Sequence, residues 1–152
     1  MKNKIVVLDN LEDMKKSYAL LCKLYPYNFS MDDYMNLLGE MRSVHYRQVA
    51  CFHLEKVIAI AGISTGTKLW CGKYMDMDNF IVQPEYRSQG IGDKLMNYIY
   101  DLSREENCSL LSCDVYNENY NAQKFYMNHG FIPRGNHFIT IHDNNLDLAP
   151  HD

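Results

Sequence analysis

Residues 74–93 read YMDMDNFIVQPEYRSQGIGD and form the most informative stretch of this sequence. Alternating residues predict a strand over residues 74–82, and an amphipathic pattern predicts a long helix after Gly92. The turn between them contains Gly90 and Gly92. Backbone N–H groups at a helix N-terminus lack partners within the helix, and the helix dipole favours an anion there. A strand that passes through a glycine-bearing turn into a helix therefore predicts a phosphate-binding site.

The length and charge of the chain narrow the class of protein that carries this site. A chain of 152 residues predicts one domain, residues 1–152, with one core. A net charge of −4 argues against a nucleic-acid-binding protein, which usually shows a basic excess. No apolar run approaches the roughly 18 residues of a membrane span, and no signal peptide is evident after Met1. We therefore expect a cytoplasmic protein with neither a nucleic-acid nor a membrane partner.

The cysteines and histidines are scattered. The five cysteines include no C-x-x-C pair, and the six histidines include no H-E-x-x-H motif. An odd number of unpaired cysteines is typical of reduced, buried thiols in a cytosolic protein rather than of a disulfide framework. We therefore expect no disulfide and no metal site.

The N-terminal part of the chain predicts a strand and two helices. Residues 5–8 form a short apolar strand, and an apolar stripe predicts a helix over residues 11–25 that Pro26 stops. Ser30 is the predicted cap of a second helix, whose apolar residues are Tyr34, Leu37, Leu38 and Met41. The aromatic linker of residues 25–29 either packs between the helices or forms a loop that contacts substrate.

From Tyr46 onward the pattern changes to that of strands. Residues 49–54 and 57–61 are rich in β-branched residues and predict a hairpin. Residues 62–72 predict a looser crossing that leads into the strand ending at Val82.

The C-terminal part predicts further helices and strands. The helix that follows the glycine turn has a core-facing stripe formed by Ile91, Leu95, Met96, Ile99, Tyr100 and Leu102. A strand over residues 110–116 and a helix over residues 119–128 follow, and Gly130 ends that helix. Residues 131–132 and 137–142 can supply final strands. Strands, hairpins and helices in this order predict a mixed α/β (α+β) fold.

The glycine turn matches neither of two common nucleotide-binding motifs. It lacks the third glycine of the dinucleotide fingerprint, and no G-x-x-x-x-G-K-[ST] occurs anywhere. It does fit the pattern R-x-x-G-x-G/A at residues 87–92, and a second segment reads Asn119-x-x-Ala122-x-x-Phe125-Tyr126-x-x-x-Gly130-Phe131. In their order and separation the two segments resemble the GNAT superfamily of acyl-CoA-dependent N-acetyltransferases, over residues 46–131. The resemblance implies a central mixed, mostly antiparallel, splayed sheet flanked by helices.

The resemblance also implies where acetyl-CoA, the cosubstrate, would bind. The strand of residues 74–82 would splay from that of residues 110–116, so that Phe80, Ile81 and Val82 offer backbone hydrogen bonds to the pantetheine arm. The pyrophosphate would be held at the turn by Arg87, Ser88, Gln89, Gly90, Ile91, Gly92 and Asp93, mainly through backbone N–H groups. Ser88 stands where the family commonly has glycine. The second segment would contribute Asn119 and Ala122 near the pantetheine and Tyr126 beside the thioester sulfur.

The implied reaction is direct attack of a primary amine on the thioester in a ternary complex. An alkyl amine has a pKa of about 10.4, so it must lose a proton before it attacks. Asp76 and Asp78 lie two residues apart in a strand, so they are expected to share a face with Tyr74 and Phe80. Family members place an acid on this strand as a base or water-relay anchor, and Asp78 aligns best. Alternatively, both carboxylates are solvated or only bind substrate.

Other side chains have two readings each. Tyr126 is the candidate proton donor to the departing thiolate, or else a core tyrosine beside Ala122 and Phe125. His129 fits the core or the helix end better than a catalytic role. Lys94 and Lys124 can meet the cofactor's 3′-phosphate, or be solvated.

The sequence thus predicts an N-acetyltransferase that acts on a small cationic amine or on a peptide or protein amine. A non-catalytic acyl-CoA-binding regulatory module is the alternative, and an unrelated α/β phosphate-binding protein is a third reading. The family also contains homodimers, which leaves that assembly open. No motif identifies the acceptor.

Overall fold

The computed structural model describes residues 2–25 and 29–146. The chain divides into two compact units, Met1–Cys113 and Asp114–Asp152. The predicted helix stop at Pro26 and most of the aromatic linker lie outside the described residues. No helix in the described ranges is long and apolar enough to cross a membrane.

The first unit contains a five-stranded sheet in the order β1-β2-β3-β4-β5. Its strands are β1 (Lys4–Leu8), β2 (Arg47–His53), β3 (Lys56–Lys68), β4 (Gly72–Val82) and β5 (Leu110–Cys113). The first four strands pair antiparallel with their neighbours, and β5 pairs parallel with β4. The prediction of a mixed, mostly antiparallel sheet is confirmed.

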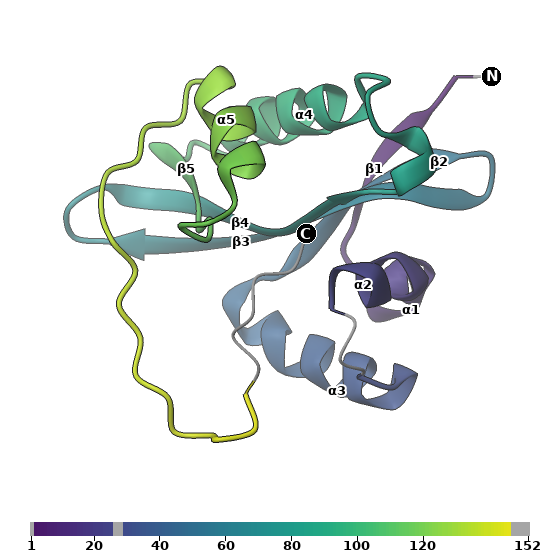
Figure 1. Ribbon diagram of the computed structural model, residues 1–152, viewed down its shortest axis with the longest axis horizontal. Helices are drawn as coiled ribbons and strands as arrows, with labels where there is room; N and C mark the ends of the chain where they lie inside the picture. The colour runs from purple at the N-terminus through teal and green to yellow at the C-terminus, as the bar shows by residue number, and fades with distance from the viewer. Residues whose placement is uncertain (1, 26–28, 147–152) are drawn as a thin grey trace. The chain divides into compact units, whose positions relative to one another are not determined.

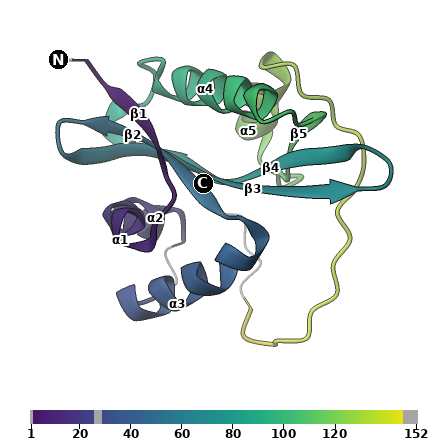
Figure 2. The same cartoon turned by 180° about the vertical axis from the view of Figure 1, so that it is seen from behind.

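Helices cover both faces of this sheet (Figures 1 and 2). On one face lie α1 (Leu11–Met14), the 3-10 turn η1 (Lys15–Ser17), α2 (Tyr18–Leu24) and α3 (Met31–Met41). On the other face lies α4 (Ile91–Glu105). The predicted helix over residues 11–25 is therefore interrupted by a 3-10 turn. Ser30 caps α3 as predicted, since its hydroxyl accepts a hydrogen bond from the Asp33 N–H at 3.1 Å.

The two sheet faces carry separate apolar layers. Beneath α1–α3 a cluster of buried side chains includes Met14, Leu21, Leu38, Tyr46, Ile60 and Ile81. On the other side, α4 buries Ile91, Leu95, Met96 and Ile99. Because successive residues of a strand point to opposite faces, β4 contributes to both layers.

Two predicted core positions on helices are exposed. The Tyr100 side chain of α4 is 47% exposed and that of Leu37 in α3 is 49% exposed. In α4 the buried position is taken by Ser103, whose hydroxyl donates to the Tyr100 carbonyl at 2.7 Å. A serine that satisfies its own hydroxyl within the helix can lie in the core at little cost, and an apolarity pattern does not detect it.

The predicted crossing over residues 62–72 is wrong. β3 continues to Lys68, and its last residues pair with β4 from Asp76 back to Gly72. These residues are partly exposed or exposed, so they lack the apolar alternation of a covered strand while still forming the ladder. The real turn is residues 69–71, where Leu69 and Trp70 are exposed.

The second unit contains α5 (Tyr120–Asn128) and an extended segment. Gly130 has φ +85°, and the N–H groups of Gly130 and Phe131 donate to the carbonyls of Met127 and Tyr126. This pattern is the glycine-dependent helix end that was predicted. The predicted strands at 131–132 and 137–142 do not occur in the described part of the segment, and Ile132 and Phe138 are exposed. Strand propensity alone does not make a strand without a pairing partner.

Candidate functional site

A β-bulge interrupts β4 within the stretch of residues 74–93. Asp78 pairs with Gly62 and Ile81 pairs with Ile60, so two β4 residues, Asn79 and Phe80, face a single β3 residue. Asn79 adopts the left-handed region, with φ +52°. A bulge adds one residue to a strand and puts later side chains out of step with earlier ones. The prediction that Phe80 shares a face with Asp76 and Asp78 is therefore wrong, and Ile81 takes that face beside Tyr46.

Beyond the bulge, β4 has an open edge. β5 pairs with β4 only from Tyr74 to Met77, which leaves residues 78–82 without a neighbouring strand on that side in the described chain. β5 ends at Cys113 instead of the predicted residue 116. Strand edges of this kind can accept an extended ligand as an added strand. Phe80, Ile81 and Val82 all lie on this edge.

The glycine turn leads from β4 through the 3-10 turn η3 (Pro84–Tyr86) into α4. Gly90 is the N-cap of α4 with φ +74°, and as a glycine it contributes no side-chain cap. Two side chains instead brace the turn: Arg87 Nε donates to the Val82 carbonyl at 3.1 Å, and Gln89 Nε2 donates to the Glu85 carbonyl at 3.0 Å. Backbone N–H groups at the start of a helix such as α4 are the kind of donors that bind anions.

Ser88 adopts the left-handed region with φ +59°. For a residue other than glycine this conformation costs about 1–2 kcal/mol. The position where the resemblance places a glycine is thus one where the backbone favours glycine.

The acidic pair is held on the β4 face that points toward α1–α3. Asp76 lies opposite Ser112 of β5, and the Ser112 hydroxyl donates to Asp76 Oδ1 at 2.7 Å. Asp78 lies opposite Gly62, and its Oδ1 occupies the space above that glycine. A Cβ on Gly62 would approach Asp78 Oδ1 closest and would lie 2.6 Å from the Tyr46 hydroxyl. Gly62 therefore makes room for both groups.

The two carboxylates differ in their surroundings. Asp78 as a residue is exposed, yet one of its oxygens is packed over Gly62 beside Tyr46. This burial of the carboxyl group, together with the negative charge of Asp76, raises the pKa of Asp78 to about 6. A carboxyl group with such a pKa changes protonation state close to neutral pH, as a general base requires.

Sequence reasoning missed four residues that shape this site: Gly62, Ser112, Tyr46 and Asn79. The Tyr46 hydroxyl donates to Asn79 Oδ1 at 3.0 Å, and Asn79 Nδ2 donates to the hydroxyl of Tyr25. The available signal was Asn79 itself, because asparagine is depleted in strands and tolerates the left-handed region.

The predicted residues of the second segment lie together on α5. Asn119 caps the helix, with its Oδ1 accepting from the Ala122 N–H at 3.0 Å. Tyr126 is partly buried, and its ring makes edge contacts with Phe125 and Phe131 at centroid distances of 5.4 and 5.5 Å. His129 lies at the helix end, where its Nδ1 is 3.0 Å from the Phe125 carbonyl.

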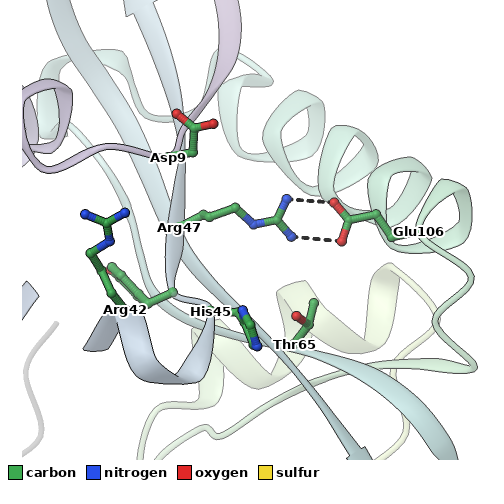
Figure 3. Close-up of a pocket in the computed structure, with 7 residues that line it drawn as sticks. Asp9, Arg42, His45, Arg47, Thr65 and Glu106 are labelled. Carbon is green, nitrogen blue, oxygen red and sulfur yellow. Dashed lines mark hydrogen bonds and ion pairs between the residues drawn. The ribbon is translucent and has the colours of Figure 1, made fainter. Parts of the chain in front are cut away.

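A cavity of about 320 Å³, lined in part by Tyr46, lies near the start of β2 (Figure 3). Its lining residues are Asp9, Arg42, His45, Tyr46, Arg47, Thr65 and Glu106. Arg47 and Glu106 form a two-point ion pair at 2.7 and 2.8 Å. No predicted site residue lines this cavity. Because the charges of Arg47 and Glu106 neutralise each other, we interpret this ion pair as a contact that stabilises the fold.

Comparison with known proteins gives a consistent picture. A model of the Acetyltransferase (GNAT) family matches residues 13–131, a range that includes parts of both compact units. A Bacillus subtilis protein is 29% identical over 141 residues, which are 89% of this chain and 85% of that protein. Its name, a provisional one, is ribosomal protein bS18-alanine N-acetyltransferase. A thialysine N-epsilon-acetyltransferase of Bos taurus is 33% identical over 57 residues, which are 38% of this chain and 34% of that protein.

Solved structures share the fold at low sequence identity. Ribosomal-protein-alanine N-acetyltransferase from Brucella melitensis has a TM-score of 0.78 at 16% identity, with 91% of this chain and 99% of that chain covered. AAC(6')-Iy in complex with the bisubstrate analog CoA-S-monomethyl-acetylneamine has a TM-score of 0.76 at 16% identity, with 94% and 99% covered.

Proposed function

Because the chain belongs to the GNAT acetyltransferase family, we propose that it is an acetyl-CoA-dependent N-acetyltransferase that acts on a primary amine. The reaction is direct attack of the amine in a ternary complex. One observation carries the proposal: a single strand–turn–helix unit joins an open strand edge, a helix N-terminus that begins at a glycine and a carboxyl group with a raised pKa. These three features would bind, respectively, the pantetheine arm of the thioester, its pyrophosphate and an amine acceptor.

The chain's own groups fit acetyl-CoA at two points. The open edge at Phe80, Ile81 and Val82 offers backbone hydrogen bonds to an extended amide-bearing arm. The start of α4, with Gly90 in the left-handed region, offers N–H groups and a favourable dipole to a pyrophosphate. When bound, acetyl-CoA supplies an acetyl group activated as a thioester. Asn119 and Ala122 of α5 are proposed to contact the pantetheine arm.

Asp78 is the proposed general base. An ammonium group with a pKa of about 10.4 must be deprotonated, either directly or through water, before its nitrogen can attack. With a pKa of about 6, Asp78 is mostly ionised at neutral pH and can accept a proton. Asp76, held by Ser112, adds a second negative charge on the same face that attracts a cationic acceptor.

Tyr126 is the proposed proton donor to the departing thiolate. A phenol can act as a general acid by donating the proton of its hydroxyl group. Its ring is held by edge contacts with Phe125 and Phe131, which would orient the hydroxyl.

The acceptor we propose is either a small cationic amine or a peptide or protein amine. The two carboxylates on β4 favour an acceptor with a cationic group, whether it is a small amine or a peptide or protein amine. The names of the Bacillus subtilis and Bos taurus relatives include an alanine of a ribosomal protein and the epsilon nitrogen of thialysine, respectively.

The experiment that tests this function measures free thiol released from acetyl-CoA with a panel of amines. The panel contains peptides with N-terminal alanine, lysine and thialysine, and polyamines. We expect acceptor-dependent thiol release that falls in Asp78→Asn and in Tyr126→Phe. Binding of acetyl-CoA without transfer to any panel member would instead support the non-catalytic module. Absence of acetyl-CoA binding would overturn the proposal.

A further inference from the structure

The bulge residue Asn79 has a side chain whose hydrogen bonds run in both directions. Its Oδ1 accepts from the Tyr46 hydroxyl at 3.0 Å, and its Nδ2 donates to the Tyr25 hydroxyl. Tyr46 directly precedes β2 and Tyr25 directly follows α2, and they lie 33 and 54 residues away from Asn79 in sequence. We call the three residues Tyr25, Asn79 and Tyr46 the bulge clamp.

On the Tyr46 side, the clamp is anchored in the core. Tyr46 is 5% exposed and belongs to the apolar cluster under α1–α3. Gln48 Nε2 lies 3.4 Å from the Tyr46 hydroxyl and donates to the Tyr34 hydroxyl at 3.0 Å. The Tyr34 hydroxyl in turn donates to the Met14 carbonyl at 2.7 Å. A chain of polar groups thus connects α1 with the bulge through a low-dielectric core, where each hydrogen bond is costly to lose.

The clamp acts at the one position that decides the register of the open edge. With Asn79 in the left-handed region, Ile81 pairs with Ile60 and Val82 with Ala59. A regular extended conformation at Asn79 would remove the bulge. The residues that follow would then pair with β3 in a register shifted by one residue. A shift of one residue exchanges the two faces of a strand and also the backbone groups that point to its free edge. The conformation of Asn79 therefore determines which backbone groups of residues 80–82 face a ligand.

An asparagine at this position without partners would not fix the bulge. The left-handed region is accessible to asparagine but is not its preferred conformation. In this backbone geometry the Asn79 amide reaches both hydroxyl groups, and these two hydrogen bonds favour it.

We propose that Asn79 is a positioning residue for acyl-CoA binding, and that Tyr25 and Tyr46 hold it so that the edge at residues 80–82 has the register the ligand requires. The inference rests on the proposed function. It assigns Asn79, Tyr25 and Tyr46 no contact with the acetyl group or the acceptor.

The test compares Asn79→Gly, Tyr46→Phe and Tyr25→Phe with the parent protein by calorimetric titration with acetyl-CoA. Glycine adopts positive φ freely, so Asn79→Gly removes the clamp without forbidding the bulge. We expect the acetyl-CoA Kd to rise about threefold to tenfold in Asn79→Gly, the range expected when one or two net hydrogen bonds are lost. The Kd for acetyl-CoA should rise more in Tyr46→Phe than in Tyr25→Phe, because Tyr46 is buried and Tyr25 is 37% exposed.

Hydrogen exchange in the absence of ligand provides a second measurement. We expect faster exchange at the residue 80–82 amides that pair with β3 in all three variants, and unchanged exchange in β1. The double variant Tyr46→Phe/Asn79→Gly should lose no more affinity than Asn79→Gly alone, since both changes break the same hydrogen bond. Tyr100→Phe, which removes a hydroxyl from an exposed tyrosine of α4, is the matched control and should bind acetyl-CoA like the parent.

The outcomes separate the inference from the function on which it rests. A parent protein that binds no acetyl-CoA overturns the proposed function. A parent that binds it, with Asn79→Gly and Tyr25→Phe equal to the parent in Kd and in exchange at residues 80–82, overturns the clamp. These two variants decide the matter even if Tyr46→Phe fails to fold.

Discussion

Asp78 of β4 pairs with Gly62 of the neighbouring strand β3, and its carboxyl group lies in the space that a side chain at position 62 would fill. The same space borders the hydroxyl of Tyr46. This relationship couples the proposed base to a single glycine in the neighbouring strand. Any side chain at position 62 must displace Asp78, Tyr46 or both.

Gly62→Ala tests this coupling. The added methyl group would crowd Asp78 and Tyr46, and overpacking of this kind costs about 1–3 kcal/mol of unfolding free energy. We expect denaturant unfolding to show a loss in that range and acetyl transfer to fall. Gly39→Ala in α3 is the control, because a Cβ there meets nothing within 4 Å. It should stabilise the protein by roughly 0.5–1 kcal/mol through helix propensity. Equal free energies of unfolding for Gly62→Ala and the parent would contradict the close packing of Asp78 and Tyr46 over Gly62.

The raised pKa of Asp78 makes stability depend on pH in a defined direction. The folded-state pKa of about 6 lies above the ordinary value of 3.8, so the folded state binds the proton more tightly than the unfolded chain. Folding stability from this group is therefore present below pH 3.8 and lost as pH rises through 6. We expect Asp78→Asn to raise the melting temperature more at pH 8 than at pH 4. A gain that is the same at both pH values would show that Asp78 has an unperturbed pKa.

The turn before α4 depends on the backbone of Gly90. Its φ of +74° costs other residues about 1–2 kcal/mol, and a Cβ there would meet nothing within 4 Å, so Gly90→Ala tests the backbone alone. We expect a loss of stability of that size and weaker acetyl-CoA binding by calorimetry. Ser88→Gly is the complementary variant, since Ser88 already adopts φ +59°. It should bind acetyl-CoA as the parent does. Weakened binding in Ser88→Gly with normal binding in Gly90→Ala would reverse the roles assigned to the turn.

The ion pair in the cavity of Figure 3 is expected to contribute stability only. Arg47 and Glu106 have side chains 25% exposed and contact each other at two points. Arg47→Lys keeps the charge but loses the two-point geometry, at a cost of about 1 kcal/mol. Denaturant unfolding should show this loss while acetyl transfer per folded molecule stays unchanged. A selective fall in transfer would place the cavity in the functional site.

The sequence predicted the features that local interactions determine. The cap at Ser30, the glycine-dependent end of α5 and the strand–turn–helix at residues 74–93 depend on residues close together in the chain. Patterns over a few residues carry that information. The family resemblance then identified the fold.

Features determined by distant residues could not be read in this way. The bulge at Asn79 depends on Tyr25 and Tyr46, and the position of Asp78 depends on a glycine in another strand. The strands predicted at 131–132 and 137–142 failed for the same reason, since strand formation needs a partner as well as propensity.

The pH dependence of kcat/KM shows whether Asp78 is the base of an N-acetyltransferase. The measurement uses thiol release from acetyl-CoA with the best amine of the panel, for the parent and for Asp78→Asn. We expect kcat/KM of the parent protein to fall below an apparent pKa of about 6, which is the pKa of Asp78 in the free protein. We also expect Asp78→Asn to be slower by about 100-fold or more and to lack this acidic limb. An Asp78→Asn variant with the parent's rate and the same acidic limb would contradict this role of Asp78.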